Sequence, residues 1–172
     1  MTLKRTLPNG TEVWLREQTE GDRAVLTELF AGLSQRSRNL RFMAGVPAQL
    51  PPTLLDILDA ADGRNHVGLI AVRRGRAVGA ARYIRVAEGG SEADVAVTVA
   101  DELQGQGLGR LMLRELMQRA AASGIDRLRF EMLAENRAAR SLAGSFGASL
   151  RSDGQITVAV VRTHPEIEPV AA

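Results

Sequence analysis

Residues 94–110, Asp-Val-Ala-Val-Thr-Val-Ala-Asp-Glu-Leu-Gln-Gly-Gln-Gly-Leu-Gly-Arg, decide the fold of this chain. Valine and threonine recur through the first part, which predicts a strand over residues 94–100. The second part contains Gly105, Gly107 and Gly109 and leads directly into a stretch with apolar residues at helical spacing. A glycine-rich loop between a strand and a helix presents unpaired backbone N–H groups at the positive end of the helix dipole. This stretch therefore predicts a site for a phosphate or pyrophosphate group.

Outward from this stretch, strand and helix patterns alternate along the chain. Strands are predicted near residues 11–18, 66–74, 77–86, 94–100, 127–133, 148–151 and 157–162. Helical spacing predicts three helices between residues 19 and 63, one after the glycine loop, and one from Asn136 to Phe146. The sum is an α/β (α+β mixed) fold, with a mixed twisted sheet of six to seven strands and helices on both faces. We expect one domain over residues 1–163 and a flexible C-terminal tail over residues 164–172.

The composition argues against several kinds of site. The chain has no cysteine and only two histidines, His66 and His164, which argues against disulfides, a cysteine nucleophile, a metal site and a histidine-based triad. No stretch approaches the ~20 apolar residues of a membrane-spanning helix, and the N-terminus lacks the apolar segment of a signal peptide. We therefore expect a cytoplasmic protein with no metal and no membrane partner.

Positive charge gathers around the glycine loop. Residues 103–151 hold eight Arg against four Asp and Glu, whereas residues 1–102 hold thirteen basic and thirteen acidic residues. Nucleic acid is not expected as a partner, because aromatic residues make up only 3% of the chain and no Lys/Arg cluster is dense enough for a binding face. A small polyanionic cofactor explains the local excess of arginine.

The glycine loop has partial features of other phosphate-binding motifs. A kinase-type P-loop needs Lys and then Ser or Thr after its last glycine, and Gly109 is followed by Arg-Leu, so that interpretation fails. A dinucleotide-binding loop is a better alternative, because Glu131 ends the next predicted strand, where a ribose-binding acid is expected. However, Gly109 follows Gly107 one position too early for that fingerprint. A structural turn that binds nothing is the third alternative.

Residues 104–109, Gln-Gly-Gln-Gly-Leu-Gly, fit the pattern Q/R-x-x-G-x-G/A. They resemble the acetyl-CoA pyrophosphate loop of the GNAT superfamily of N-acetyltransferases, and the resemblance extends over nearly the whole chain. Asn136-Arg-Ala-Ala139 is similar to the Asn-x-x-Ala pattern of a later helix in that family, although from the residues alone Asn136 is simply an N-cap. The resemblance implies an N-acetyltransferase domain with the GNAT fold. In that fold the strand before the loop splays from the next strand, and the pantetheine arm of acetyl-CoA lies between them.

The resemblance also implies which residues hold acetyl-CoA. Backbone groups of the strand would bind the pantetheine arm, the loop and the start of the next helix would bind the pyrophosphate, and the motif Asn would begin the later helix. The residues concerned are Val97, Thr98, Val99, Gln104, Gly105, Gln106, Gly107, Leu108, Gly109, Arg110 and Asn136.

Acetyl transfer to an amine needs a base, because a free lysine amine has a pKa of ~10.4 and must lose a proton before it attacks. Asp94 is the first candidate, since GNAT proteins that acetylate protein lysines resemble this segment with Glu in its place. Glu92 nearby and Glu131 on the neighbouring strand are alternatives, and Asp94 could also simply face solvent at a strand start. A backbone N–H from Val97 or Thr98 would stabilise the developing oxyanion.

One catalytic feature of the family is missing from the sequence. Many GNAT proteins carry a Tyr that acts as general acid toward the leaving thiolate, and Ala143 occupies that position here. The only tyrosine, Tyr83, lies on an earlier predicted strand. We therefore expect the thiolate to be protonated by water or released beside a helix N-terminus. The departure leaves a non-catalytic acyl-CoA-binding sensor as an alternative function.

Residues 33–42, Leu-Ser-Gln-Arg-Ser-Arg-Asn-Leu-Arg-Phe, resemble the Leu-Ser-x-x-Ser-x-x-x-Arg-Phe stretch of bacterial protein-lysine acetyltransferases. In that family the region helps frame the acceptor side; from the residues alone it is two packed helices. Acidic residues at this end would steer a cationic amine; they are Glu88, Glu92, Asp94, Asp101 and Glu102. We predict a protein lysine as the acceptor, with a small-molecule amine (polyamine, aminoglycoside or amino acid) as the alternative, and a monomer or homodimer.

Overall fold

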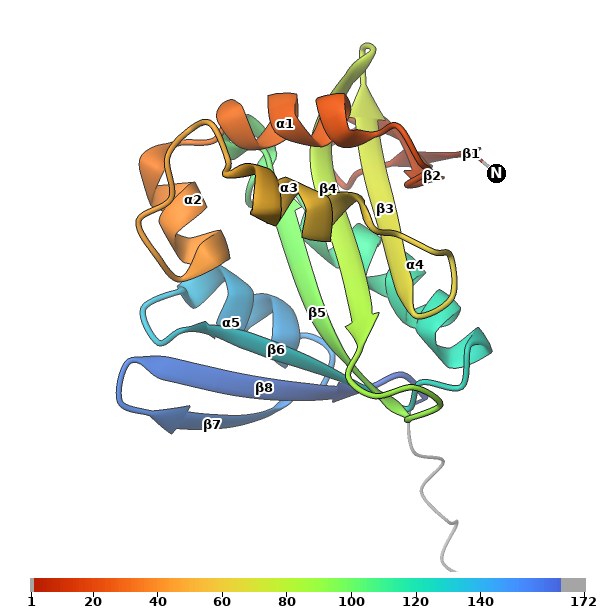
Figure 1. Cartoon of the computed structure of the whole chain (residues 1–172), viewed down its shortest axis with the longest axis vertical. Coiled ribbons are helices and arrows are strands. Elements are labelled where there is room, and N and C mark those ends of the chain that lie inside the picture. Colours follow the sequence, from red (N-terminus) through yellow and green to blue (C-terminus); the bar gives the residue numbers. More distant parts are fainter. Residues whose placement is uncertain (1, 165–172) are drawn as a thin grey trace, which may run out of the picture.

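The computed structural model describes residues 2–164, and at their centre lies an eight-stranded β-sheet (Figure 1). The strands are β1 (Thr2–Thr6), β2 (Glu12–Glu17), β3 (His66–Arg73), β4 (Arg76–Arg85), β5 (Glu92–Val99), β6 (Arg127–Leu133), β7 (Ser149–Asp153) and β8 (Ile156–Arg162). The helices are α1 (Arg23–Ala31), α2 (Gln35–Phe42), α3 (Pro52–Asp59), α4 (Leu108–Ala122) and α5 (Arg137–Gly144), with a short 3-10 helix η1 (Asp101–Leu103) before α4. The predicted mixed α/β fold is confirmed.

The strands lie in the order β1-β2-β3-β4-β5-β6-β8-β7. Within the described residues, every neighbouring pair is antiparallel except β5 with β6. The sequence predicts six to seven strands, and the additional one is β1, which pairs with β2 at the edge of the sheet. Its residues alternate between exposed and half-buried positions, and four of the five are polar. No alternation of apolar and polar residues therefore marks this strand in the sequence.

β5 and β6 form a fork in the sheet. They pair only from Glu92 with Arg127 to Asp94 with Arg129. Beyond that point β5 stays with β4 and β6 stays with β8, so the two strands separate. Figure 1 shows β5 running roughly vertically and β6 nearly horizontally from the place where they meet. The fork leaves one edge of β5 without a strand partner beyond Asp94, so backbone groups on that edge can meet a ligand.

Helices cover both faces of the sheet (Figure 1). α1 packs on β4 and on α3, and α4 packs on β3, β4 and β5 from the opposite face. α2 contacts β5 and β6, and α5 contacts β6 and β8. The core has a fully buried part on each face of the sheet. On one face it contains Leu26 and Phe30 of α1, and on the other it contains Leu108, Met112 and Leu116 of α4. Their helical spacing is the pattern that predicted these helices.

The C-terminal ends of α4 and α5 can be compared with the helix ends that the sequence predicts. α4 ends at Ala122, and Gly124 follows with a φ of 72°, as its sequence predicts. α5 ends at Gly144, before the predicted Phe146, because the N–H of Phe146 already closes a turn on Ala143. In residues 2–164, no helix is both long and apolar enough to cross a membrane. The predicted tail, apart from His164, falls outside the described residues.

Candidate active site

The glycine loop before α4 has a backbone shape that favours glycine. Gly105 has a φ of 72° and Gly107 a φ of 90°, both in the left-handed region. A Cβ atom at Gly107 would also lie 3.1 Å from Cδ of Pro8. α4 then begins at Leu108 with no side-chain cap and no acidic residue in its first turn. The first amides of α4 are therefore available to an anion.

A groove of about 430 Å³ runs from this loop along β5 to α5. Its walls come from β5, the loop, α4, β6 and α5, and they include Val97, Val99, Gln104, Gly105, Gly107, Gly109, Arg110, Phe130, Asn136, Ala139 and Leu142. A Cβ atom at Gly109 would lie 3.7 to 3.8 Å from side chains on both sides of the groove. The missing side chain at this position therefore keeps the groove wide. The groove extends from the glycine loop along β5 to α5, with backbone amides at one end. This arrangement suits an extended cofactor that carries phosphate groups.

The free edge of β5 faces this groove. The N–H of Ala100 donates to the carbonyl of Val78 on the β4 side. Because backbone groups alternate in direction along a strand, Val97 and Val99 point theirs to the opposite edge. There, Nε2 of Gln104 donates to the carbonyl of Val99 over 3.1 Å. The backbone of Val97 is thus the one placed to meet a ligand in the fork.

Three of the predicted cofactor residues turn their side chains elsewhere. The hydroxyl of Thr98 accepts a hydrogen bond from Nε of Arg41 over 3.1 Å, and its carbonyl lies on the β4 side. The side chain of Gln106 accepts a hydrogen bond from Asn9, and Leu108 is fully buried in the core. For Gln106 and Leu108, only the backbone amides remain for a phosphate group. Thr98 does not face the groove through either group.

Asn136 lies where the groove meets a second cleft, and it lines both. It is the N-cap of α5, and its Oδ1 accepts a hydrogen bond from the N–H of Ala139 over 3.1 Å. The cap uses the side-chain oxygen and fixes the orientation of the amide. The Nδ2 group is thereby left as a donor at the junction.

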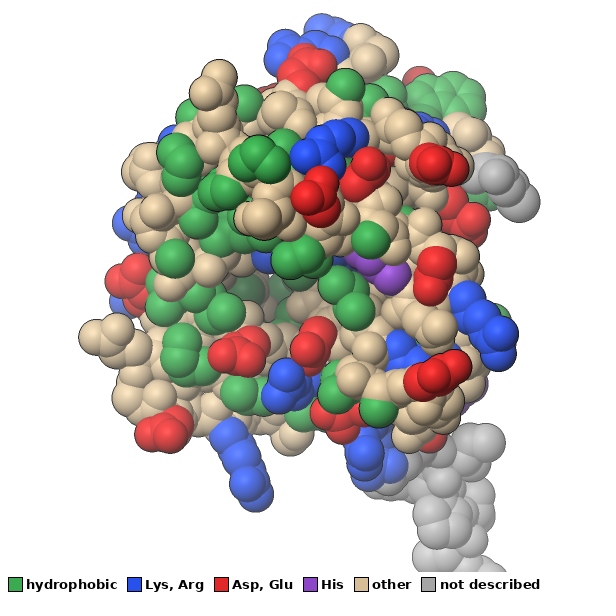
Figure 2. Space-filling model, viewed as in Figure 1, with side chains coloured by type: hydrophobic (Ala, Val, Ile, Leu, Met, Phe, Trp, Pro, Cys, Tyr) green, Lys and Arg blue, Asp and Glu red, His purple; other side chains and the backbone are tan. Residues whose placement is uncertain are grey.

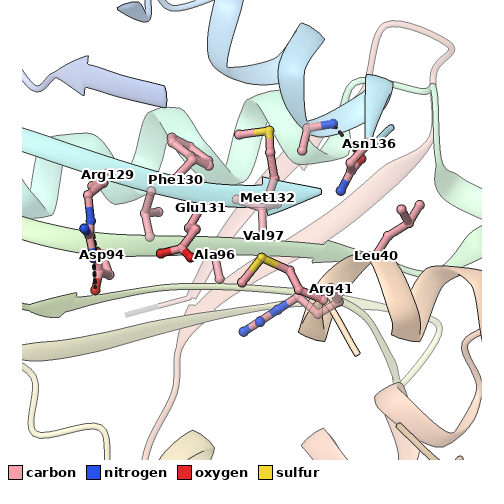
Figure 3. Close-up of a pocket in the computed structure, with 13 residues that line it drawn as sticks. Leu40, Arg41, Asp94, Ala96, Val97, Arg129, Phe130, Glu131, Met132 and Asn136 are labelled. Atoms are coloured by element: carbon pink, nitrogen blue, oxygen red, sulfur yellow. Dashed lines mark hydrogen bonds and ion pairs between the residues drawn. The ribbon is translucent and has the colours of Figure 1, made fainter. Parts of the chain in front are cut away.

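The second cleft, of about 250 Å³, lies in the fork between β5 and β6 (Figure 3). Asp94 lines it where the two strands part, and its carboxylate accepts two hydrogen bonds from Arg129, over 2.7 and 3.3 Å. These bonds raise the pKa of the Arg129 guanidinium above its ordinary value. Glu131 lines the same cleft from β6 and has no hydrogen bond or ion pair with a described residue. Glu92 is not part of the cleft and pairs with Arg127 over 3.2 Å.

A third cleft, of about 190 Å³, lies on the other side of β5 beneath α2 and α3. Its apolar walls come from Phe42, Leu54, Ile57, Leu58 and Ile84. Asp94 and Arg41 line both this cleft and the fork cleft. Figure 2 shows a hollow on this face, with acidic and basic side chains gathered below it. The third cleft reaches the fork from the side opposite the groove, where the sequence leads us to expect the amine acceptor, and we call it the acceptor cleft for this expectation.

The family model described as Acetyltransferase (GNAT) family matches residues 35–148, from α2 to the residue before β7. The chain belongs to the GNAT family of acetyltransferases. GNAT enzymes are acetyl-CoA-dependent, and the resemblance read from the glycine loop and the later helix is confirmed. The match contains every part of the groove and the fork described above.

Relatives and solved structures agree with this GNAT assignment. Acetyltransferase PA5475 of Pseudomonas aeruginosa is 32% identical over 146 residues, which cover 83% of this chain and 77% of that protein. Acetyltransferase Pat of Mycolicibacterium smegmatis is 30% identical over 120 residues, which cover 68% of this chain and 35% of Pat. The chain thus spans about a third of the length of Pat.

Two solved structures show the same fold. The GNAT domain of S. lividans PAT superposes with a TM-score of 0.87 at 24% identity, over 94% of this chain and 96% of that domain. The yncA protein of Salmonella typhimurium, whose structure holds acetyl-CoA, superposes with a TM-score of 0.70 at 19% identity, over 94% of this chain and all of that protein.

The charges near the acceptor cleft of this GNAT protein differ from the sequence expectation. Three of the acids predicted to steer a cationic amine are engaged in ion pairs or hydrogen bonds; they are Glu92, Asp94 and Asp101. Two cations line the cleft instead. Burial lowers the pKa of Arg41 to about 10, and burial together with the charge of Arg41 lowers the pKa of Arg82 to about 9. The sequence shows these arginines but not that both line one cleft.

α2 is attached to the β5–α4 connection by Asp101. The carboxylate accepts hydrogen bonds from the N–H and hydroxyl of Ser34, both over 2.9 Å, and from the hydroxyl of Ser37 over 2.6 Å. Burial by itself raises the pKa of Asp101, but the bonds from Ser37 and Ser34 outweigh it and hold the pKa below its ordinary value. Nε2 of Gln104 also donates to Ser37 over 3.2 Å. The cofactor loop and the acceptor-side helix are therefore one connected unit.

Replacing Asp101 by Ala is expected to raise the KM for the amine by roughly 10-fold, with a smaller change in acetyl-CoA binding. The helix α2 then loses three hydrogen bonds to a charged group, each contributing about 1.5–3 kcal/mol. Steady-state kinetics with varied amine and varied acetyl-CoA measure the two effects separately. Glu102→Ala, at an exposed neighbouring position, is the control. An unchanged KM for the amine in the Asp101 variant would contradict this coupling.

The described residues bring no tyrosine to the fork cleft. Ala143 is fully buried within α5, so the position of the family tyrosine carries no hydroxyl. Tyr83 is fully buried too, and its hydroxyl donates to the carbonyl of Arg64 and to Ser123. Tyr83 pairs with Val95 close to the fork, but these partners hold its side chain outside the fork cleft, which it does not line. The general acid of many GNAT proteins therefore has no tyrosine counterpart here.

Proposed function

We propose that this GNAT protein transfers the acetyl group of acetyl-CoA to the ε-amine of a protein lysine. The observation that carries the proposal is the meeting of three features at one fork. The anion-binding groove reaches the fork from one side, the acceptor cleft reaches it from the other, and Asp94 lines the two clefts that meet there.

The groove fits acetyl-CoA in its polar groups as well as in its extent. The uncapped start of α4, Gly105 to Arg110, offers backbone amides and a guanidinium to the pyrophosphate. The backbone groups of Val97 on the free edge of β5 are offered to the pantetheine arm, in the manner of an added strand. Asn136 offers its Nδ2 near the fork. When bound, acetyl-CoA supplies an activated acyl group and a thiol leaving group.

We assign the chemistry to two groups of this chain. Asp94 takes the proton of the lysine ammonium, directly or through a water, so that the amine nitrogen can form the new C–N bond. The N–H of Val97 donates to the carbonyl oxygen as negative charge develops on it. As the amide forms, the C–S bond would break, and the second proton of the amine nitrogen would pass through water to the leaving thiolate. Arg129 holds the Asp94 carboxylate in place throughout.

The acceptor is assigned from the segment over residues 33–42. The segment resembles a stretch of protein-lysine acetyltransferases, and its residues form α2 and part of the wall of the acceptor cleft. The similarity to acetyltransferase Pat supports an acetyl group as the group transferred. The apolar walls suit the methylene chain of a lysine.

The test is CoA release with three mixtures: a lysine peptide, a polyamine, and no added amine. Release that depends on the peptide, together with an acetylated lysine found by mass spectrometry, supports the proposal. Release with the polyamine alone would place the acceptor among small molecules. Tight acetyl-CoA binding without release in any mixture would indicate a sensor.

A further inference from the structure

Arg41 is a half-buried cation in the cleft wall, and no described carboxylate pairs with it. Its Nε donates to the hydroxyl of Thr98, and its Cζ lies 4.9 Å from the ring centre of Phe42. Its two terminal nitrogens have no hydrogen bond or ion pair with a described residue. A desolvated guanidinium that is not neutralised by a carboxylate is costly to fold. Such groups are typical of binding sites, where the ligand supplies the missing anion.

The position of Arg41 indicates which ligand supplies that anion. It lies at the fork and in the acceptor cleft, not in the groove beside the glycine loop. Figure 3 shows its side chain leaving α2 and running below β5, toward the end of the cleft that holds Glu131 and Asp94. We place the phosphates of acetyl-CoA at the other end of the groove, so they are not the anion that Arg41 binds. We infer that the acceptor supplies this anion.

Arg82 adds to the positive field without competing for the anion. Its guanidinium already donates to the carbonyl of Leu58 over 2.5 Å and to Gln18 over 3.4 Å, and it lies 3.3 Å from Nε2 of His66. Among the described residues that line the acceptor cleft, Asp94 carries a carboxylate, and this carboxylate is bound to Arg129. A cleft with these charges disfavours an acceptor that carries positive charge alone.

We propose that the acceptor carries a carboxylate close to its amine, and that Arg41 binds this carboxylate while the amine faces Asp94. The two free nitrogens of the guanidinium can form the paired hydrogen bonds that a carboxylate accepts. The carboxylate can come from an acidic side chain beside the target lysine or from the main chain of a free amino acid. The inference rests on the proposed function and names its acceptor more closely.

The test compares matched acceptors that differ only in this carboxylate. One pair is a lysine peptide with Glu next to the lysine and the same peptide with Gln; the other is a free amino acid and its amide. The wild-type kcat/KM is expected to be at least ~10-fold higher for the carboxylate member of one pair. Arg41→Gln is expected to bring the ratio of kcat/KM between the two members to within about 3-fold of one, with a larger loss for the carboxylate member than for the neutral member. Arg36→Gln, on the exposed side of the same helix, should keep the preference.

The results answer two questions: where the carboxylate of the acceptor comes from, and whether Arg41 binds it. Preference within the peptide pair identifies an acidic side chain, and preference within the amino-acid pair identifies a main-chain carboxylate. The role of Arg41 as the carboxylate-binding residue is overturned if the wild type shows no preference, or if Arg41→Gln lowers kcat/KM equally for both members of a pair. In either case, acetylation of the neutral peptide still supports the proposed function. No acetylation of any acceptor overturns both. The acetyl-CoA thermal shift of each variant verifies that it is folded.

Discussion

Replacing Asp94 by Asn is expected to lower kcat by about 10²–10⁴-fold, because Asn cannot take the proton of the amine. Acetyl-CoA binding should change little, since Asp94 is not part of the groove. Stability should change by less than about 1 kcal/mol: the side chains of Arg129 and Asp94 are 36% and 52% exposed, and ion pairs of this kind contribute little. Initial rates of CoA release, with the acetyl-CoA thermal shift as a check on folding, measure both quantities.

Two matched variants test whether another carboxylate is the general base in place of Asp94. Glu131→Gln removes the other carboxylate of the fork cleft, and Glu92→Gln removes the acid that lies outside it. We expect both to keep kcat within about 5-fold of the wild type, well below the range for loss of a general base. Full activity in Asp94→Asn with a collapse in Glu131→Gln would move the role to β6.

Replacing Gly109 by Val is expected to weaken acetyl-CoA binding by at least ~100-fold, a loss of about 2.7 kcal/mol. The new side chain would fill the space between the β5 and α5 walls, where a Cβ atom already makes van der Waals contact. Gly109 lies in the first turn of α4, and its backbone is not among those with positive φ, so folding should be preserved. Calorimetric titration with acetyl-CoA measures the change.

Gly109→Ala is the matched control for the groove. Its Cβ atom meets neighbours at 3.7 Å or more, which is ordinary contact. We expect it to bind acetyl-CoA within about 10-fold of the wild type and to fold at least as stably, since Ala favours the helix more than Gly. Equal binding by the Val and Ala variants would mean that the cofactor does not pass through this part of the groove.

The local parts of the site could be predicted from the sequence, because short-range rules govern them. The spacing of Gly105, Gly107 and Gly109 indicated a loop with left-handed backbone that opens a helix, and the structure has it. The N-cap at Asn136 follows from one side chain and the amide three residues later. β1 was missed because an edge strand with polar residues carries no alternating pattern.

The long-range parts of the site could not be predicted, because they depend on contacts between distant segments. Asp101 was interpreted as an acid that steers the amine, whereas it holds Ser34 and Ser37, more than 60 residues earlier in the chain. Arg129 gave no sign of its ion pair with Asp94, which depends on the register of β5 and β6. Arg41 was interpreted as part of a motif, and its position in the cleft wall without a carboxylate partner became visible only in three dimensions.

The measurement that tests the central claim most directly is a thermal shift with acetyl-CoA, CoA and NADH in parallel. Acetyl-CoA at 100 times its Kd should stabilise the protein by ~2.7 kcal/mol, which for a chain of this length raises Tm by roughly 5–11 °C. We expect this rise with acetyl-CoA and not with NADH. A rise with NADH alone, or none with acetyl-CoA at millimolar concentration, would contradict the assignment of the groove and of the transferase chemistry built on it.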